Sequence, residues 1–212
     1  KLFGDSASLP YYRSRMHRSD GEDVIVSRTG YTGEYGYEIY APWDQGPEIW
    51  RSLLDEGAEY GVLPIGLGAR DSLRMEMGYC LYGNDIDETT NPVEAGLVWV
   101  VKPKKTEYIG KEAYLHYKKN GAERALLGFR LSAREIPRKG YEILHAGSPV
   151  GEITSGGFSP SCEVGIGLGY VRADVAKEEG GFTVAIRNKQ AEAKPVRGSF
   201  VPSSVKEEGE DS

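Results

Sequence analysis

Short β-type runs recur at even spacing in the second half of the chain, and this pattern restricts the possible folds more than any other feature. Beyond Gly121, turn residues separate four such runs, at residues 125–131, 150–154, 165–171 and 182–187. Short strands at this spacing are typical of a small barrel or sandwich. We therefore predict a C-terminal β-barrel domain over residues 121–204. A hydroxyl-rich turn is expected at residues 154–160, where it could shape a site or form a corner.

The first half mixes strand and helix patterns and predicts a separate domain over residues 1–101. Residues 23–27 contain three β-branched residues in succession, which indicates a short strand, and residues 37–40 alternate in the manner of a strand. Residues 44–60 repeat apolar side chains at helical spacing, which predicts an amphipathic helix packed against a sheet. The predicted fold class is α+β, with an antiparallel sheet and helices followed by the small β-barrel.

Three further segments complete the predicted organisation of the chain. Residues 93–101 end in an apolar run that is interpreted as a buried strand. Residues 102–120 are expected to be a linker followed by a helix of about ten residues. The acidic residues 205–212 are expected to be disordered, because so polar a segment cannot bury enough apolar surface to fold.

A glycine- and tyrosine-rich stretch, RTGYTGEYGYE, occupies residues 28–38 between two strand-like runs. Its glycines let the backbone turn tightly and approach a ligand, while its tyrosines offer flat faces and hydroxyl groups. The stretch is therefore interpreted either as a wall of a binding site or as a plain connection between antiparallel strands. It is not a phosphate-binding loop, because no Gly-Lys-Ser/Thr follows the glycines. Glu38 shares a strand face with Tyr40 and would be held in place.

Arg70 is the second residue of interest, because two glycines at residues 66–68 lead into a short helix that has this arginine in its first turn. The helix dipole favours an acid there, such as Asp71, so the arginine requires another reason. A partner carboxylate or a ligand would supply one. The sequence leaves open a simple structural ion pair between Glu38 and Arg70.

Composition excludes several classes of protein. With 2 cysteines and 3 histidines in 212 residues, neither a disulfide framework nor a zinc site can be assembled, so we expect reduced thiols and no metal. No apolar run approaches the roughly 18 residues of a membrane span, and the first residues lack the features of a signal peptide. We therefore expect a cytoplasmic protein without a membrane partner. Because the chain starts at Lys1, we also expect it to be part of a longer polypeptide.

Charge is unevenly distributed along the chain. Residues 1–90 carry 8 basic and 16 acidic side chains, whereas residues 91–205 carry 17 and 12. The basic half could attract a carboxylate ligand or an acidic partner protein, although scattered solvated lysines would give the same count. No stripe rich in both lysine and aromatic residues indicates nucleic-acid binding.

Several motifs, taken together and in order, resemble the T protein of the glycine cleavage system, a family of tetrahydrofolate-dependent aminomethyltransferases. They cover nearly the whole chain, at residues 28–38, 66–71 (GLGARD), 73–78, 81–87 (LYGNDID), 92–97, 109–113, 151–156, 159–160 and 199–202. The resemblance departs at Tyr35, often acidic in this motif, and at Val205, a tyrosine in some members. It implies that residues 1–101 are the rear part of the folate-binding region.

The resemblance also implies an activity and a set of site residues. Members move the aminomethyl carbon from a lipoyl carrier (H) protein to tetrahydrofolate and release ammonia. Glu38 matches the glutamate that holds the pterin, Tyr31 the tyrosine beside it, Arg70 the arginine of the folate site, and Tyr79 a tyrosine lining the same cavity. A folate-dependent demethylase of the same superfamily and a non-catalytic folate-binding module are the alternatives.

Family members begin with a further block that carries the aspartate assigned to catalysis. No counterpart of that block is found in this sequence, so we assign no catalytic residue and expect the chain alone to be inactive. The expected partners are the lipoyl carrier protein and the missing N-terminal segment of the same enzyme. The lysines at positions 102, 104 and 105 are the predicted contacts for an acidic carrier.

Overall fold

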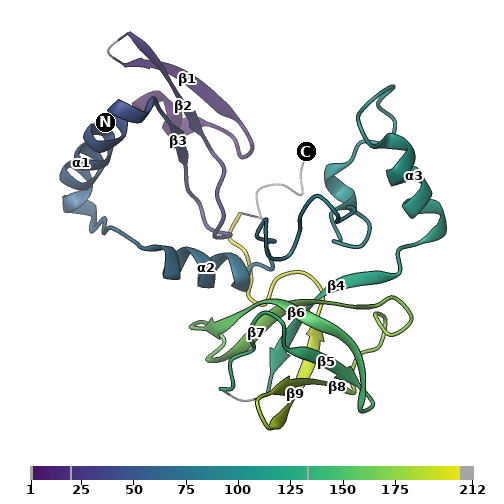
Figure 1. The fold of residues 1–212 in the computed structure, drawn as a ribbon. Helices are drawn as coiled ribbons and strands as arrows, with labels where there is room; N and C mark the ends of the chain where they lie inside the picture. Colours follow the sequence, from purple (N-terminus) through teal and green to yellow (C-terminus); the bar gives the residue numbers. More distant parts are fainter. Residues whose placement is uncertain (1, 20, 133, 206–212) are drawn as a thin grey trace. The chain divides into compact units, whose positions relative to one another are not determined.

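The structure is a computed structural model that describes residues 2–19, 21–132 and 134–205 (Figure 1). Its packing divides the chain into two compact units, the first formed by residues 1–73 and 202–212 and the second by residues 74–201. The domain limits predicted at residues 101 and 121 stay a prediction. Most of the predicted acidic tail, residues 206–212, lies outside the described residues.

The first unit contains a three-stranded antiparallel sheet in the order β1-β2-β3. Its strands are β1 (Ser14–Ser19), β2 (Glu22–Ser27) and β3 (Glu38–Tyr40), and a short 3-10 helix, η1 (Gly4–Ser8), precedes them. Val24 and Val26 are buried on one face of β2, while Ile25 between them is exposed. The predicted strands at residues 23–27 and 37–40 are thus present, the latter shortened to three residues. Strand β1 was not predicted, because its sequence SRMHRS is polar.

Two helices follow the sheet in the first unit. Helix α1 (Gly46–Gly57) lies between the 3-10 turns η2 (Trp43–Gln45) and η3 (Ala58–Tyr60), and helix α2 begins at Leu67 and ends at Glu76. The predicted helix at residues 44–60 is therefore confirmed, with Pro47 in its first turn. Its apolar face is incompletely covered, because Trp50 is 50% exposed and only one residue of α1, Gly57, is fully buried.

The second unit contains a closed six-stranded antiparallel barrel in the order β4-β7-β6-β5-β8-β9 (Figure 1). The strands are β4 (Arg124–Leu131), β5 (Glu142–His145), β6 (Ser148–Ser159), β7 (Val164–Arg172), β8 (Phe182–Ile186) and β9 (Lys189–Val196). The four predicted strands are present, and the small barrel is confirmed. Two strands were missed: β5 has only four residues, and β9 carries the polar sequence KQAEAKPV.

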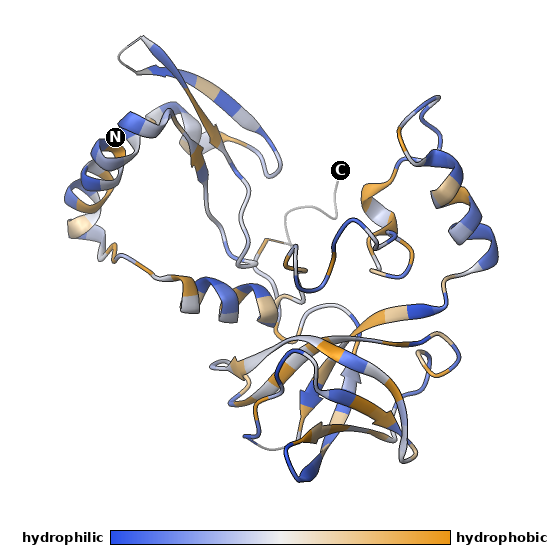
Figure 2. Cartoon of the chain, in the orientation of Figure 1, coloured by the Kyte–Doolittle hydropathy of each residue, from blue (hydrophilic) through white to orange (hydrophobic). Residues whose placement is uncertain are grey.

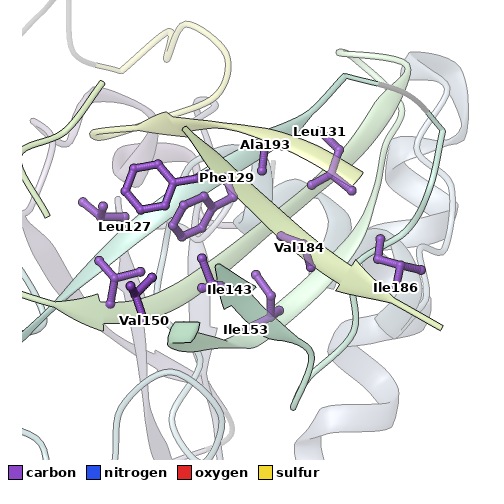
Figure 3. Packing of buried hydrophobic residues seen from close by; sticks show 11 residues of the cluster. Leu127, Phe129, Leu131, Ile143, Val150, Ile153, Val184, Ile186 and Ala193 are labelled. Carbon is purple, nitrogen blue, oxygen red and sulfur yellow. The ribbon is translucent and has the colours of Figure 1, made fainter. Parts of the chain in front are cut away.

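Apolar side chains from all six strands fill the barrel (Figure 3). Phe129 and Phe182 meet edge to face near its centre, with ring centroids 5.5 Å apart, a geometry that aromatic pairs prefer. Figure 2 shows hydrophobic and hydrophilic positions alternating along the barrel strands, as expected when one face of each strand points inward. The cluster consists of Leu127, Phe129, Leu131, Ile143, Val150, Ile153, Val171, Phe182, Val184, Ile186 and Ala193.

Two predictions in the second unit are wrong. Most of residues 154–160 is strand and not turn: Thr154 to Ser159 belong to β6, Thr154 lies at a register shift, and Ser155 to Ser159 pair with β7. Their glycines allow close packing instead, since a Cβ at Gly156 would lie 2.3 Å from the carbonyl oxygen of Pro137. The buried strand expected at residues 93–101 is also absent. A 3-10 helix, η4 (Val98–Val100), stands there with its side chains exposed, and a short apolar run cannot distinguish the two structures.

Helix α3 (Lys111–Asn120) precedes the barrel, as predicted, and buries Tyr114. Cys80 and Cys162 are both free thiols. Burial, together with the nearby charge of Asp85, raises the pKa of the Cys80 thiol to about 11. Cys80 therefore stays protonated at neutral pH, as expected of a structural thiol. Within the described residues, no helix combines the length and apolar character needed to cross a membrane.

Candidate functional site

The glycine-rich stretch at residues 28–38 connects β2 to β3 in the first unit and is fixed at its tip. Gly33 adopts a φ of +74°, a backbone conformation that suits glycine, and its carbonyl oxygen accepts two hydrogen bonds. The donors are the backbone N–H of Ser204 and the hydroxyl group of Ser203, each at 3.0 Å. The hydroxyl group of Ser204 also donates to Glu34 at 2.7 Å. Hydrogen bonds from Ser203 and Ser204 thus fix the position of this loop.

Glu38 is the first residue of β3, pairs with Ser27 on β2, and is half-buried. Its Oε2 atom accepts hydrogen bonds from the hydroxyl group of Thr29 and, at 3.2 Å, from the phenol of Tyr40. The negative charge of Glu38 raises the pKa of Tyr40, with burial and the hydrogen bond adding to the effect. Both donors engage the same carboxylate oxygen, so neither occupies Oε1, and no other described residue is found to donate to it.

Arg70 lies in the first turn of α2, as predicted, and its guanidinium group stacks on an aromatic ring. Its Cζ atom is 4.5 Å from the ring centroid of Tyr31, within the range of a cation–π interaction. Among the described residues, no ion pair joins Arg70 to Glu38, so the simple ion pair that the sequence left open is not formed. The structure therefore brings Arg70 to Tyr31, and the carboxylate of Glu38 has hydroxyl partners instead.

Tyr79, the fourth predicted residue, belongs to the second unit and directly follows α2. Its side chain is half-buried. Its backbone N–H donates to the carbonyl oxygen of Arg74 at 2.9 Å, and its own carbonyl oxygen accepts from the Arg74 guanidinium at 3.0 Å. These backbone bonds fix the position of Tyr79 after the helix. The structure groups the other three predicted residues in the first unit.

Sequence reasoning missed Thr29 and Tyr40 as partners of Glu38. A signal for Tyr40 existed, because residues two apart on a strand share a face. Thr29 gave no such signal, because its contact depends on the path of the loop at residues 30–37. The hydroxyl group of Thr29 also lies 3.0 Å from that of Ser27, so the two hydroxyl groups and the carboxylate form one short network.

In the second unit, two charged residues near the end of α2 are buried and hold it to neighbouring segments. Arg74 pairs with Asp85 at 2.8 Å and donates to the hydroxyl group of Ser155 on β6 at 3.0 Å. Glu76 accepts hydrogen bonds from the hydroxyl groups of Ser159 and Ser161, at 2.5 and 2.7 Å. In the segment that follows α2, Asp85 thus serves an ion pair. Among the described residues, no group of three or more acidic, histidine or cysteine side chains could hold a metal ion.

A pocket of about 670 Å³ also lies in the second unit, between the segments at residues 88–92 and 100–102 and helix α3. Lys102 and Lys105 line it together with Tyr108, Tyr114 and Tyr117. None of the four predicted site residues does so. The pocket combines cationic and aromatic side chains, and two of the three lysines predicted to contact an acidic carrier stand at it.

Comparison with known proteins gives the same family for both parts of the chain. The family model described as the GCVT N-terminal domain matches residues 1–105, and the glycine cleavage T-protein C-terminal barrel domain matches residues 124–202. An aminomethyltransferase of Halothermothrix orenii is 49% identical over 92% of this chain and 54% of its own length. One from Bacteroides thetaiotaomicron is 43% identical over 92% of this chain and 55% of its own length.

A solved structure gives the same result at the level of the fold. It is the crystal structure of glycine cleavage system aminomethyltransferase T from Bartonella henselae, which matches with a TM-score of 0.84 and 32% identity. The match covers 95% of this chain and 56% of that one. The chain thus spans about half the length of the curated relatives it matches. On both family matches and on these relatives, the chain belongs to the glycine cleavage T-protein family.

Proposed function

We propose that this chain contributes the folate-binding part of a tetrahydrofolate-dependent aminomethyltransferase of the glycine cleavage system. In this reaction the aminomethyl carbon passes from a lipoyl carrier protein to tetrahydrofolate, and ammonia is released. The relatives named aminomethyltransferase support the activity. The observation that carries the proposal is the arrangement of Glu38, with a hydroxyl-anchored carboxylate, in the same unit as Arg70 stacked on Tyr31.

The chemistry of these three side chains fits a pterin ring. A pterin presents a ring N–H beside an amino group, and one carboxylate can accept hydrogen bonds from both. Glu38 suits this task because Thr29 and Tyr40 both donate to Oε2 and so fix its orientation while Oε1 stays open. The stacked planes of Tyr31 and Arg70 offer a flat, polarisable surface for an aromatic ring. Tyr79, in the second unit, is proposed as a further contact of the folate.

The residues of this chain would bind and orient the co-substrate. Tetrahydrofolate supplies the nitrogens that take up the one-carbon unit. The contribution of Glu38, Tyr31 and Arg70 is to hold the pterin in one orientation, which converts an encounter into a positioned reaction. The charges of Glu38 and Arg70 also stay in fixed positions as charge develops in the reacting groups. No proton transfer is assigned to a residue of this chain.

The lipoyl carrier (H) protein is the proposed donor, and a cytoplasmic location is part of the same proposal. The exposed lysines at positions 102, 104 and 105 are its proposed contacts, and two of them line the aromatic pocket. Reversing the charge of all three should weaken binding of an acidic carrier at low salt and matter less as salt screens the attraction. Unchanged affinity at low salt would reject this surface.

Direct measurement of tetrahydrofolate binding tests the site. Glu38→Gln and Arg70→Ala should each cost about 1–3 kcal/mol, because each removes a charged group from the proposed contacts with the pterin, which is about 5- to 150-fold in Kd. Glu34→Gln is the matched control, since it makes the same change on the same loop but on an exposed side chain that bonds Ser204. Equal affinity of Glu38→Gln and Glu34→Gln would reject the assignment of Glu38.

The half-length match to the relatives favours one second candidate, a folate-binding module without turnover. The two functions separate in one assay. The chain is combined with the part of the Halothermothrix orenii enzyme that it does not match, and ammonia release from an aminomethyl-lipoyl carrier is measured with tetrahydrofolate. Turnover that is lost in Glu38→Gln supports the transferase. Tetrahydrofolate binding without turnover supports the binding module.

A further inference from the structure

The first unit exposes an apolar groove beside its smallest strand. The groove has a volume of about 550 Å³ and is lined by nine residues of β3, η2, α1 and the connection between β3 and η2, namely Ile39, Ala41, Pro42, Trp43, Gly46, Pro47, Ile49, Trp50 and Leu53. None of these side chains carries a charge. Trp43 is 95% exposed and Trp50 is 50% exposed, and such a cluster of large apolar side chains marks an interaction site.

The same unit exposes a second apolar segment, which connects α1 to α2. Leu63, Ile65 and Leu67 are 71%, 64% and 82% exposed in it. Figure 2 shows this connection as a largely hydrophobic segment between two amphipathic helices. Segments that remain in water rarely carry so many large apolar residues in succession, so this segment also requires a partner.

The sheet of the first unit is open at both edges. Strands β1 and β3 each pair only with β2 among the described residues, and β3 has three residues. Three strands with a partly covered face are close to the lower limit of independent stability. An unpaired edge is also a template on which another polypeptide can add a strand. The open edge of β3 is next to the groove, because Ile39 belongs to both.

We propose that this groove, together with the segment at residues 62–67, is the docking surface for the polypeptide that makes up the remainder of the family fold. The chain spans 54–56% of the length of the relatives, so the complete fold contains about as much again of polypeptide. The match to the GCVT N-terminal domain begins in this unit, at residue 1. A folded polypeptide with an apolar strand or helix satisfies the groove and the open edge at once.

Other occupants explain the surface less well. Small-molecule sites contain a few well-placed polar groups that orient the ligand, and the groove offers no charged side chain for this purpose. A second copy of this chain would cover Trp43 but would bring only the same open sheet edge. The proposal is independent of folate binding, so its failure and the failure of the proposed function are separate outcomes.

Binding of the complementary polypeptide tests the proposal. The full chain is mixed with the part of the Halothermothrix orenii aminomethyltransferase that it does not match, and complex formation is followed by light scattering after size-exclusion chromatography and by isothermal titration calorimetry. We expect a 1:1 complex, a shift of tryptophan emission to shorter wavelength, and slower hydrogen exchange over residues 39–53. The tryptophan emission and the hydrogen exchange report burial of the groove directly, whereas light scattering and calorimetry report complex formation.

Trp43→Ser is the decisive variant, because a side chain that is 95% exposed contributes little to the fold of the free chain. It should weaken the complex by about tenfold or more, as loss of a central aromatic anchor does. Tyr60→Ser is the matched control, since Tyr60 is 74% exposed in the same unit and does not line the groove. No complex, equal affinity of both variants, or a homodimer that depends on Trp43 and excludes the added polypeptide would each overturn the proposal.

Discussion

Arg74 and Asp85 form an ion pair with a distance of 2.8 Å between Nη1 and Oδ2, and their side chains are 1% and 0% exposed. The remaining donors and acceptors of the pair are largely used. Asp85 accepts from the hydroxyl group of Thr154 and from the backbone N–H of Leu81, and Arg74 donates to Ser155. The pair thus fastens the end of α2 and the following loop to β6 within the second unit.

Removing one partner of this pair should strongly destabilise the second unit. We expect Arg74→Ala or Asp85→Ala to lower the free energy of unfolding by about 3–5 kcal/mol, because the other charge stays buried without a partner. Replacing both by leucine should cost less than the sum of the two single changes. Urea denaturation followed by circular dichroism measures the three variants. Strict additivity would contradict a direct coupling between the two side chains.

The buried carboxylate of Glu76 predicts an acid-sensitive contribution to stability. Burial alone would raise its pKa, but hydrogen bonds from Ser159 and Ser161 outweigh burial and lower the pKa below the ordinary value of 4.5. A lowered folded-state pKa gives stability that is complete above 4.5 and is lost as pH falls through the folded value. The free energy of unfolding should therefore decline below about pH 4.5.

Glu76→Gln isolates this contribution, because glutamine cannot titrate. The variant should show a weaker decline of stability between about pH 4.5 and pH 2 than the unchanged chain. Glu107→Gln, an exposed glutamate in the same unit, is the control and should leave the decline as it is. If the free energy of unfolding of both variants had the same pH dependence as that of the unchanged chain, the hydrogen bonds from Ser159 and Ser161 to Glu76 would not be stabilising.

Gly151 on β6 should not tolerate a side chain. A Cβ atom there would lie 1.8 Å from the carbonyl oxygen of Tyr170, which belongs to the paired strand β7. Gly151→Ala must therefore push two strands of the barrel apart, and we expect it to cost about 1–3 kcal/mol or more. Gly180→Ala is the matched control, because nothing lies within 4 Å of its Cβ position. Equal thermal stability of the two variants would contradict the strand spacing.

The hydroxyl donors of Glu38 give a prediction about function. Thr29→Val and Tyr40→Phe each remove one hydrogen bond to its Oε2 and should each weaken tetrahydrofolate binding by about 1 kcal/mol, roughly fivefold. Tyr37→Phe makes the same change at an exposed tyrosine that donates to Ala7, and it should bind normally. Calorimetric titration with tetrahydrofolate measures all three. Full affinity of both Thr29→Val and Tyr40→Phe would show that these hydrogen bonds are not needed to position Glu38.

The barrel was largely predictable from the sequence because its strands alternate apolar and small residues along their length. Strand β7, with the sequence VGIGLGYVR, shows this alternation clearly. Strand β9 does not show this pattern, since its buried positions are Ala193 and Pro195, on either side of Lys194. The apolar residues at 98–100 misled for the opposite reason: their hydrophobicity indicated burial, but their side chains are exposed in η4.

The sequence named candidate site residues, but it did not predict the contacts that these residues make. Glu38 could be placed on a strand because alternation reaches it from Tyr40. The stacking of Arg70 on Tyr31 joins segments separated by β3 and α1, and no periodicity relates their side chains. Tyr31, Glu38, Arg70 and Tyr79 as folate contacts therefore stay a prediction that binding measurements must test.

The carbonyl oxygen of Gly33 receives its hydrogen bonds from Ser203 and Ser204, which are made much later during synthesis of the chain. The donor Ser203 lies 170 residues further along the sequence than the carbonyl it holds, so a ribosome makes the entire barrel before it makes this partner. Domains generally fold as units while translation proceeds. The barrel can close while these hydrogen bonds to the loop at residues 28–38 are still missing, so the loop should gain them only after the barrel strands have been made.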